Sequence, residues 1–308
     1  MTDQKNGIGW TNYTINPLRY KDKSSKTVWG CVKVSPGCVN CYAESLALRW
    51  GKGGPFQKRV MDDLTPYLDE KELNTILKST KIAGKRIFLG DMTDIFGDWV
   101  PDTMLDTLFA VMLSRPDVTF QILTKRVERM AEYMAATYVP GGILCELDRL
   151  GQLVKGDADP QTWPPKNIWL GTSVENQEMA DKRISVLLSM LNAVPWISAE
   201  PLVGEVDLSP YTFNAPKDPP GDDDWNSATA RNFQSHYGRD PYKRLAWVVV
   251  GGESGPNRRE MEPTWLTQIA EQCQKDRVPV FVKQDSGMLP GKQGRIPDEI
   301  WKLKEFPA

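Results

Sequence analysis

The chain has 308 residues, which is enough for one large domain or two small ones. Its composition is 40% hydrophobic and 25% charged, which excludes wholesale disorder. Lys and Arg number 38 against 40 Asp and Glu, so the formal net charge of −2 argues against a histone-like polyanion binder but permits a local basic cleft. No apolar run approaches the roughly 18 residues of a membrane span, and MTDQKNGIGW is not a signal peptide. We therefore expect a soluble, cytoplasmic protein.

Short β-rich runs alternate with amphipathic helical stretches from about residue 28 onward. The expected strands are 27–31, 86–91, 118–125, 167–174, 195–200, 245–253 and 278–284. The expected helices are 41–50, 101–115, 126–136, 176–191 and 263–276. Such alternation implies parallel strands with crossover helices. The sequence predicts an α/β fold, a partial or complete (β/α) barrel of about six to seven parallel strands in a single domain over 1–308.

Two stretches interrupt this rhythm, at about 139–166 and 208–244, and a C-terminal extension begins at about 285. Connections of this length inside a compact domain are usually lids, substrate loops or mobile surface segments. The second stretch carries five aromatic side chains, which suit a substrate platform as well as a surface excursion. They are Tyr211, Phe213, Trp225, Phe233 and Tyr237.

Polar side chains stand just after nearly every expected strand. They are Asp91, Asp94, Lys125, Ser173, Glu175, Glu200, Glu253, Lys283 and Gln284. In (β/α) barrels the carboxyl ends of the strands carry the active site. The recurrence at one topological position predicts a functional site there, although any single one of these residues is more often solvated than catalytic.

Three of the five cysteines lie within eleven residues, in the motif Cys31-Val-Lys-Val-Ser-Pro-Gly-Cys38-Val-Asn-Cys41. The chain has one histidine, His236, which makes a His-rich zinc site or a Ser–His–Asp triad improbable. In a reducing compartment clustered thiols are better metal ligands than disulfide partners. Three thiolates can hold three irons of a [4Fe–4S] cluster. A structural zinc completed by Cys145 or Cys273, or three unrelated buried cysteines, remains open.

The ending Cys38-Val-Asn-Cys41-Tyr42-Ala43 resembles the cluster loop of radical S-adenosylmethionine (SAM) enzymes, and spore photoproduct lyase and its relatives show a similar ending. Six residues separate Cys31 from Cys38, where three are usual. The chain is also similar to a family of phage and bacterial proteins with a three-cysteine motif. The segments that carry this similarity are 30–44, 86–102, 120–130, 167–177, 196–204 and 247–261.

The resemblance implies two cofactors, a [4Fe–4S] cluster on Cys31, Cys38 and Cys41, and SAM bound to the open iron. An electron passed into the cluster, from a donor such as flavodoxin or ferredoxin, would cleave SAM to methionine and a 5′-deoxyadenosyl radical. The protein would position the reactants and exclude solvent and oxygen. A phage-encoded chain would act in the host cytoplasm.

The strand-end residues are the candidates for holding SAM. Asp91 and Thr93, in the turn after an early strand, suit its ammonium group, and Lys125 suits its carboxylate. Ser173 and Glu175 suit the ribose, and Glu200 is a candidate buried acid. The remaining candidates are Gly251 and Gly252 for close backbone approach, Glu253 as an acceptor, and Tyr42 for stacking on adenine or shielding the cluster.

The substrate is less well defined by the sequence. Basic residues at Lys125, Arg126 and Arg129, at Arg258 and Arg259, and along the C-terminal tail could follow phosphates while aromatic side chains stack on an extruded base. We expect rearrangement or isomerisation of a nucleobase, or of an amino-acid-type adduct on a DNA base, as in phage DNA hypermodification. A nucleic-acid repair lyase is the close alternative. A barrel hydrolase that uses Glu175 and Glu200 with a structural zinc, and a catalytically silent cluster-bearing module, also stay open.

Overall fold

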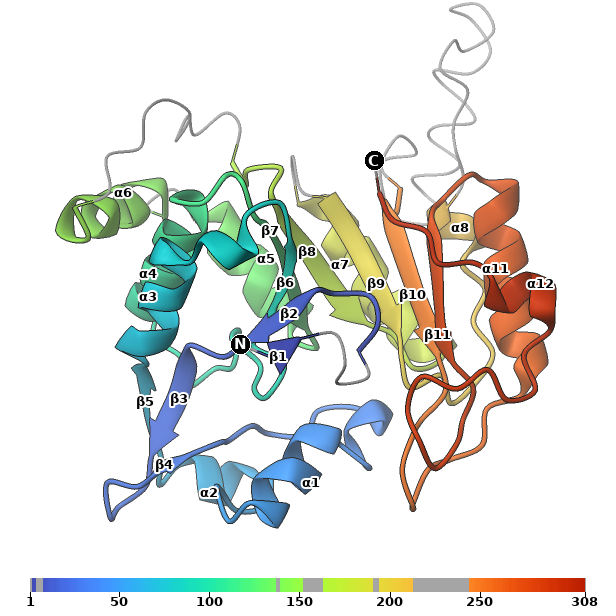
Figure 1. Cartoon of the computed structure of the whole chain (residues 1–308), viewed down its shortest axis with the longest axis horizontal. Coiled ribbons are helices and arrows are strands. Elements are labelled where there is room, and N and C mark those ends of the chain that lie inside the picture. Colours follow the sequence, from blue (N-terminus) through green and yellow to red (C-terminus); the bar gives the residue numbers. More distant parts are fainter. Residues whose placement is uncertain are drawn as a thin grey trace, which may run out of the picture. The chain divides into compact units, whose positions relative to one another are not determined.

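The computed structural model describes residues 2–3, 8–136, 139–151, 163–190, 194–212 and 244–307 (Figure 1). The chain divides into two compact units, Met1–Leu170 and Gly171–Ala308, with the boundary inside a strand. The prediction of a single domain stays a prediction. Most of the second predicted insertion, with Phe213, Trp225, Phe233, His236 and Tyr237, lies outside the described residues.

One sheet has the strand order β1-β2-β6-β7-β8-β9-β10-β11, in which β1 pairs antiparallel with β2. The other seven strands follow one another in chain order and alternate with helices, which confirms the predicted α/β class in the form of a partial (β/α) barrel. The strand bounds are β1 Thr2–Asp3, β2 Tyr13–Ile15, β6 Arg86–Leu89, β7 Thr119–Thr124, β8 Ile168–Ser173, β9 Val194–Ala199, β10 Trp247–Gly251 and β11 Val280–Gln284.

The strands predicted from apolar runs owe their burial to coverage on both faces. Every residue of β8 and of β10 is buried, as expected for parallel strands between helices. Trp196 on β9 faces Trp247 on β10 in register, with ring centroids 5.2 Å apart. A Cβ at Gly171 would lie 2.4 Å from the Trp196 ring, so only glycine leaves room for that side chain.

The first predicted strand, 27–31, is the element on which the prediction was wrong. Only Thr27–Val28 forms a strand, β4, and it belongs to a separate antiparallel sheet of order β4-β3-β5, with β3 at Leu18–Lys21 and β5 at Thr65–Leu68. The first parallel strand is β2, which pairs with β6. After β4 the Trp29 N–H donates to the Lys52 carbonyl at 2.7 Å and not to a strand of the parallel sheet.

The helices that the periodicity predicts are present. They are α1 Tyr42–Arg49, α4 Asp102–Leu113, α5 Val127–Ala135, α7 Gln177–Ser189 and α11 Pro263–Lys275. In the described part of the chain, five further α-helices were not predicted. They are α2 Lys58–Met61, α3 Glu70–Lys78, α6 Val139–Arg149 inside the first predicted insertion, α8 Ser209–Thr212 and α12 Asp298–Trp301.

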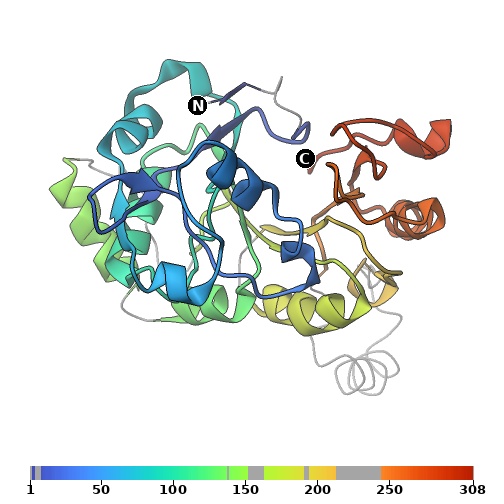
Figure 2. The same ribbon diagram turned by 90° about the horizontal axis from the view of Figure 1, so that it is seen from below.

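Within the first unit the small sheet, α1 and α2 form a layer of their own, outside the parallel strands β6 and β7 (Figure 1). Figure 2 shows this segment, in blue, on the near side of the unit when it is seen from below. In the described part of the chain no helix is long and apolar enough to cross a membrane.

Candidate functional site

The cysteine loop leaves β4 and ends at α1. A short 3₁₀ helix, Pro36–Cys38, turns the chain, and Cys41 is the residue that precedes the first turn of α1. All three cysteines are half-buried, and none of them forms a disulfide. Lys33 forms an ion pair with Glu44 at 2.6 Å, and Glu44 also accepts the Phe56 N–H at 2.8 Å. Glu44 of α1 therefore holds both the cysteine loop, through Lys33, and the segment around Phe56.

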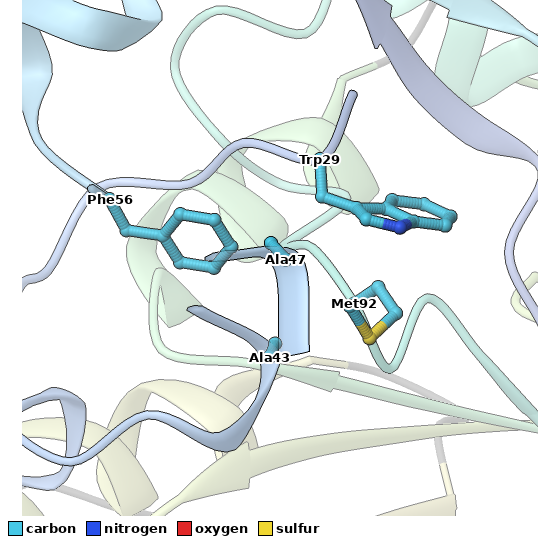
Figure 3. Packing of buried hydrophobic residues seen from close by; sticks show 5 residues of the cluster. All are labelled: Trp29, Ala43, Ala47, Phe56 and Met92. Carbon is cyan, nitrogen blue, oxygen red and sulfur yellow. The ribbon is translucent and has the colours of Figure 1, made fainter. Parts of the chain in front are cut away.

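An apolar cluster supports this loop. It consists of Trp29, Ala43, Ala47, Phe56 and Met92, against which Cys31, Cys41 and Leu46 pack. Figure 3 shows the two alanines of α1 between the Phe56 ring on one side and Trp29 with Met92 on the other. Small side chains at these helix positions let the rings approach the helix backbone. Two of the three thiols thus lie against a dry surface.

Cys31 lies beside an ion pair. The pKa of its thiol is raised to about 12, mainly by burial and next by the Asp94 carboxylate, while the Arg126 guanidinium and the Asp94 backbone N–H act in the opposite direction. Arg126 donates to Asp94 at 3.2 Å and to the Val32 carbonyl at 3.0 Å. The loop after β6 and the start of α5 therefore both hold the cysteine loop.

Cys41 is buried against the first turn of α1. Burial raises the pKa of its thiol, and the backbone N–H groups of Glu44 and Ala43 act against that rise. The Cys38 sulfur raises the pKa of Cys41 and the Lys125 ammonium lowers it. The first turn of a helix favours a negatively charged group through its free N–H donors. The Cys41 position thus suits a thiolate better than its burial alone suggests.

Asp91 is held at the carboxyl end of β6. Its side chain accepts a hydrogen bond from Asn16 at 2.5 Å, and the Tyr42 hydroxyl donates to its backbone carbonyl and, at 3.4 Å, to its carboxylate. Burial raises the pKa of Asp91, and the hydrogen bonds from Asn16 and Tyr42 oppose that rise. Asp91 and Tyr42, predicted separately from the sequence, are in direct contact.

Thr93 lies in the same turn and bonds the cysteine loop. Its hydroxyl donates to the Gly30 carbonyl at 2.7 Å and lies 3.0 Å from the Tyr20 hydroxyl. Tyr20 in turn accepts from the Trp99 indole N–H at 2.8 Å. The Arg126 guanidinium stands 4.7 Å from the centroid of the Trp99 ring. Thr93 thus belongs to a buried network that fixes the residue before Cys31.

Lys125 and Arg126 differ in environment, although the sequence treats them as a pair. Lys125 is partly buried, and its backbone N–H donates to Asp94 at 3.1 Å. Arg126 is only 8% exposed, because Asp94 neutralises it and the Trp99 ring covers it. Arg126 is therefore a buried member of an ion pair, whereas Lys125 stays partly exposed.

In the second unit, Glu200 and Gly251 meet at the ends of β9 and β10. Glu200 precedes the cis proline Pro201 and forms an ion pair with Lys283 at 3.0 Å. Ser198 donates to its other oxygen at 3.3 Å. A Cβ at Gly251 would stand 2.8 Å from the Glu200 carboxylate. The predicted buried acid is therefore only partly buried and is paired with Lys283, and Gly251 makes room for it.

Gly252 and Glu253 are also engaged by the protein itself. A Cβ at Gly252 would lie 2.4 Å from the Ser286 backbone nitrogen, so the close backbone approach predicted here is made to the loop after β11. Glu253, 6% exposed, accepts from the Arg259 backbone N–H at 2.7 Å and from its guanidinium at 2.7 and 3.0 Å. This bidentate pair fixes the turn after β10.

Ser173 and Glu175 are buried after β8. Glu175 has no solvent exposure and forms an ion pair with Arg183 of α7 at 3.1 Å. The same guanidinium donates to the Ser173 carbonyl at 2.8 Å. The pair closes the connection from β8 to α7.

The predicted residues thus fall into two groups, one in each unit. The first unit brings together the three cysteines, Tyr42, Asp91, Thr93 and Lys125. The second holds Ser173, Glu175, Glu200, Gly251, Gly252 and Glu253. Two contributors to the first group were not predicted to belong to it: Asn16 follows a strand of only three residues, and Arg126 was predicted only as one of several basic residues that could follow phosphates.

The donors present near the loop are thiols. Within the described residues, no three His, Cys, Asp or Glu side chains gather as a group that could hold one metal ion. A cubane cluster binds each thiolate to a different iron. Its ligands are therefore spread over the cluster rather than gathered around one ion.

Comparison with known proteins gives one match. A family model described as "Protein of unknown function (DUF5131)" matches residues 5–298. No curated protein matches the chain. No solved structure matches it either.

Proposed function

The chain thus belongs to the DUF5131 family, a family of unknown function, and for it we propose the activity of a radical SAM enzyme. One observation carries the proposal: three half-buried free thiols on one short loop, two of them packed against an apolar cluster. The partial (β/α) barrel is compatible with an enzyme.

The donor set of the loop fits a [4Fe–4S] cluster. Cys31, Cys38 and Cys41 supply sulfur ligands for three irons, and the fourth iron stays open for SAM. Backbone N–H groups face Cys31 and Cys41, and hydrogen bonds to ligand sulfur tune such clusters. When bound, the cluster and SAM supply the reductive cleavage that yields methionine and a 5′-deoxyadenosyl radical.

The chain's own residues fix the loop and keep it dry. Arg126 holds the Val32 carbonyl, and Thr93 holds the Gly30 carbonyl, so both residues next to Cys31 are fixed. The apolar cluster excludes water from one side of Cys31 and Cys41.

Among the predicted SAM contacts, Asp91 is the best acceptor for the ammonium group. Its carboxylate is fixed by Asn16 and approached by Tyr42, and it lies in the turn after β6. Thr93 acts on the loop rather than on SAM, because its hydroxyl is already bonded to Gly30. Lys125, close enough to Cys41 to lower the pKa of its thiol, suits the SAM carboxylate.

A carboxylate of the second group can contact SAM only where its own ion pair leaves an oxygen atom accessible. Glu175 is fully buried on Arg183, so we assign it a structural part. Glu200, paired with Lys283 at the end of β9, remains a candidate for SAM or substrate, as do Ser173, Glu253 and the two glycines.

For substrate we propose a nucleobase, or an amino-acid-type adduct on a DNA base, that is rearranged or isomerised. The electron would come from a flavodoxin or a ferredoxin. A repair lyase of the spore photoproduct type shares the same radical source and differs only in the bond that breaks.

The test is anaerobic purification followed by iron and sulfide analysis and by assay of 5′-deoxyadenosine release from SAM with dithionite. We expect about four irons per chain and nucleoside release. Cys38→Ala should lose both, because it removes one of three ligands. Cys145→Ala is the matched control, since Cys145 is an exposed thiol on α6, outside the loop, and its loss should change neither.

Two results would overturn this proposal. Zinc without iron after anaerobic reconstitution would favour the carboxylate hydrolase. Iron without nucleoside release, in wild type and Cys145→Ala alike, would favour the silent cluster-bearing module.

A further inference from the structure

The segment that surrounds the cysteine loop is strongly basic, although the chain as a whole is slightly acidic. Residues 19–59 contain nine Lys and Arg but only two acidic residues, Asp22 and Glu44, whereas the whole chain carries 38 basic and 40 acidic residues. Most of these nine side chains are exposed. The imbalance creates a local positive field that the formal net charge of −2 conceals.

Three of these cations gather at the C-terminal end of α1. The Lys26 ammonium donates to the Gly51 carbonyl at 2.7 Å, which brings the β3–β4 turn against the residues that follow α1. Arg49 ends the helix, the Lys52 carbonyl accepts the Trp29 N–H, and the side chains of Arg49 and Lys52 are both exposed. We call Lys26, Arg49 and Lys52, together with Trp50, the basic corner.

Few acidic groups neutralise the basic corner. Asp22 lies close to Lys26 but already accepts from Ser24 and from the Lys26 backbone N–H. The second acid, Glu44, is paired with Lys33. Among the described residues, no salt bridge joins an acidic side chain to a cation of the basic corner.

Several basic residues outside this segment are instead paired with acidic side chains. Arg126 is paired with Asp94, Arg129 with Asp102, and Arg259 with Glu253. Lys283 and Arg295 are paired with Glu200 and Asp285. These guanidinium and ammonium groups serve the fold, so they have little charge to offer a phosphate.

An exposed tryptophan, Trp50, lies between Arg49 and Lys52 in the sequence. Trp50 follows Arg49 directly and is 54% exposed, and Tyr42 at the other end of α1 is 49% exposed. Aromatic rings flanked by Lys and Arg are what single-stranded nucleic acid requires, since bases stack on the rings while the cations follow the phosphates.

We propose that the basic corner is a binding surface for single-stranded nucleic acid that leads its bases toward the cysteine loop. Helix α1 begins next to Cys41 and ends at Arg49, directly before Trp50. Its eight residues span about 12 Å. The inference rests on the proposed function only in treating the cysteine loop as the reaction centre. The surface itself follows from charge, exposure and the contacts of α1.

The test measures the anisotropy of a fluorescein-labelled single strand of about 16 nucleotides as purified holoprotein is added. Wild type should bind at low salt and lose affinity as salt rises. Lys26→Glu/Arg49→Glu/Lys52→Glu should weaken binding on the order of tenfold or more and should lower the slope of log affinity against log salt by about 2. The same strand annealed to its complement should bind more weakly, because paired bases cannot stack on Trp50.

The matched control is Lys71→Glu/Lys81→Glu/Lys85→Glu, which changes the net charge equally at three exposed lysines of the first unit outside the segment. It should bind nearly as wild type. Trp50→Ala should weaken binding on the order of tenfold, and Trp50→Phe should restore most of the loss, because phenylalanine keeps a ring for stacking.

Iron content is measured on the same samples, so a loss of the cluster is distinguished from a loss of the strand. Equal weakening in both triple variants would overturn the proposal, since net charge alone would then explain it. Failure of wild type to bind, together with slower reduction by flavodoxin in the Lys26, Arg49 and Lys52 variant only, would assign the surface to an acidic electron-transfer protein instead.

Discussion

At the scale of single residues, Arg126 joins two loops that the chain separates by about sixty residues. Its guanidinium neutralises Asp94 after β6 and holds the Val32 carbonyl beside Cys31. Both charges of the pair are buried, at 8% and 9% exposure. A buried pair is weak evidence for stability as long as it is intact, but loss of one partner leaves a buried charge without its counter-ion.

Arg126→Met should therefore lower the free energy of unfolding by roughly 3 kcal/mol, measured by urea denaturation. Lys58→Met is the control, because its pair with Asp62 is 81% and 60% exposed and should contribute no more than about 0.5 kcal/mol. The double variant Asp94→Asn/Arg126→Met should recover part of the loss. Equal effects of the Arg126 and Lys58 changes would contradict the buried position of the pair.

Lys304 couples stability to pH. Burial lowers the pKa of its ammonium to about 8, although it donates to the Val282 carbonyl and lies 3.4 Å from the centroid of the Trp301 ring. The unfolded chain, with an ordinary lysine pKa near about 10.4, binds this proton more tightly than the folded chain. Above about pH 8 the folded chain releases the proton first, so the contribution of Lys304 to stability becomes more favourable as pH rises.

The difference in unfolding free energy between wild type and Lys304→Met should accordingly be constant below about pH 8 and should rise in favour of wild type toward about pH 10. Urea denaturation over this range measures it. Lys302→Met, which changes an exposed neighbour, should give no such slope. A flat difference for Lys304 would mean that its ammonium remains solvated.

At the scale of elements, two consecutive glycines set the packing of β10 against β11. The Cβ that an alanine would place at position 252 meets the Ser286 nitrogen at 2.4 Å and the Asp285 carbonyl carbon at 2.9 Å. These are backbone atoms, so no side-chain rotation relieves the clash. The loop after β11 would have to move away from β10.

Gly252→Ala should cost about 1–3 kcal/mol of unfolding free energy, in the range of overpacked cores. Gly141→Ala is the matched control, since a Cβ there meets nothing within 4 Å and position 141 lies in α6. This change should stabilise the protein by up to about 1 kcal/mol, because alanine favours the helix. Thermal melts of both variants test the pair of expectations, and a neutral Gly252→Ala would show that the loop yields easily.

The prediction of helices and strands succeeded where burial produces a recognisable pattern of apolar residues in the sequence. Strands β6 to β11 are covered on both faces and read as apolar runs, and α4 and α7 show helical periodicity. It failed for β2 and β3, which have only three and four residues and include partly exposed positions. A helix such as α6 went unrecognised because Pro140, Gly141 and Gly142 open it and indicate a loop.

The sequence predicts the cysteines and the strand-end residues of the candidate site, but not the side chains that form hydrogen bonds or ion pairs with them. Clustering along the chain marks the three cysteines, and strand ends mark Asp91, Thr93 and Glu200. The contacts of Asn16 with Asp91 and of Arg126 with Val32 join distant segments through polar side chains, which leave no periodic signal. For the same reason the sequence could not show that Glu175 and Glu253 are already paired with arginines.

At the scale of the whole molecule, composition and structure give different pictures of charge. An average close to neutrality describes a chain in which one segment of 41 residues is basic and the remainder is acidic. Outside that segment, Arg126, Arg259 and Arg295 are held in ion pairs. Formal net charge therefore fixes solubility and says little about which surface attracts a polyanion.

The excursion between β2 and β6 has a consequence for the order in which the first unit folds. The chain leaves the parallel sheet after Ile15, builds the small antiparallel sheet, α1 and α3, and returns beside its starting point, where Asn12 and Arg86 bond across 74 residues of sequence. Closing so long a loop carries a larger entropy cost than any hairpin within it, so nearby segments pair first. The cysteine loop would thus be assembled locally, and β2 would join β6 late, as the last strand to close the unit.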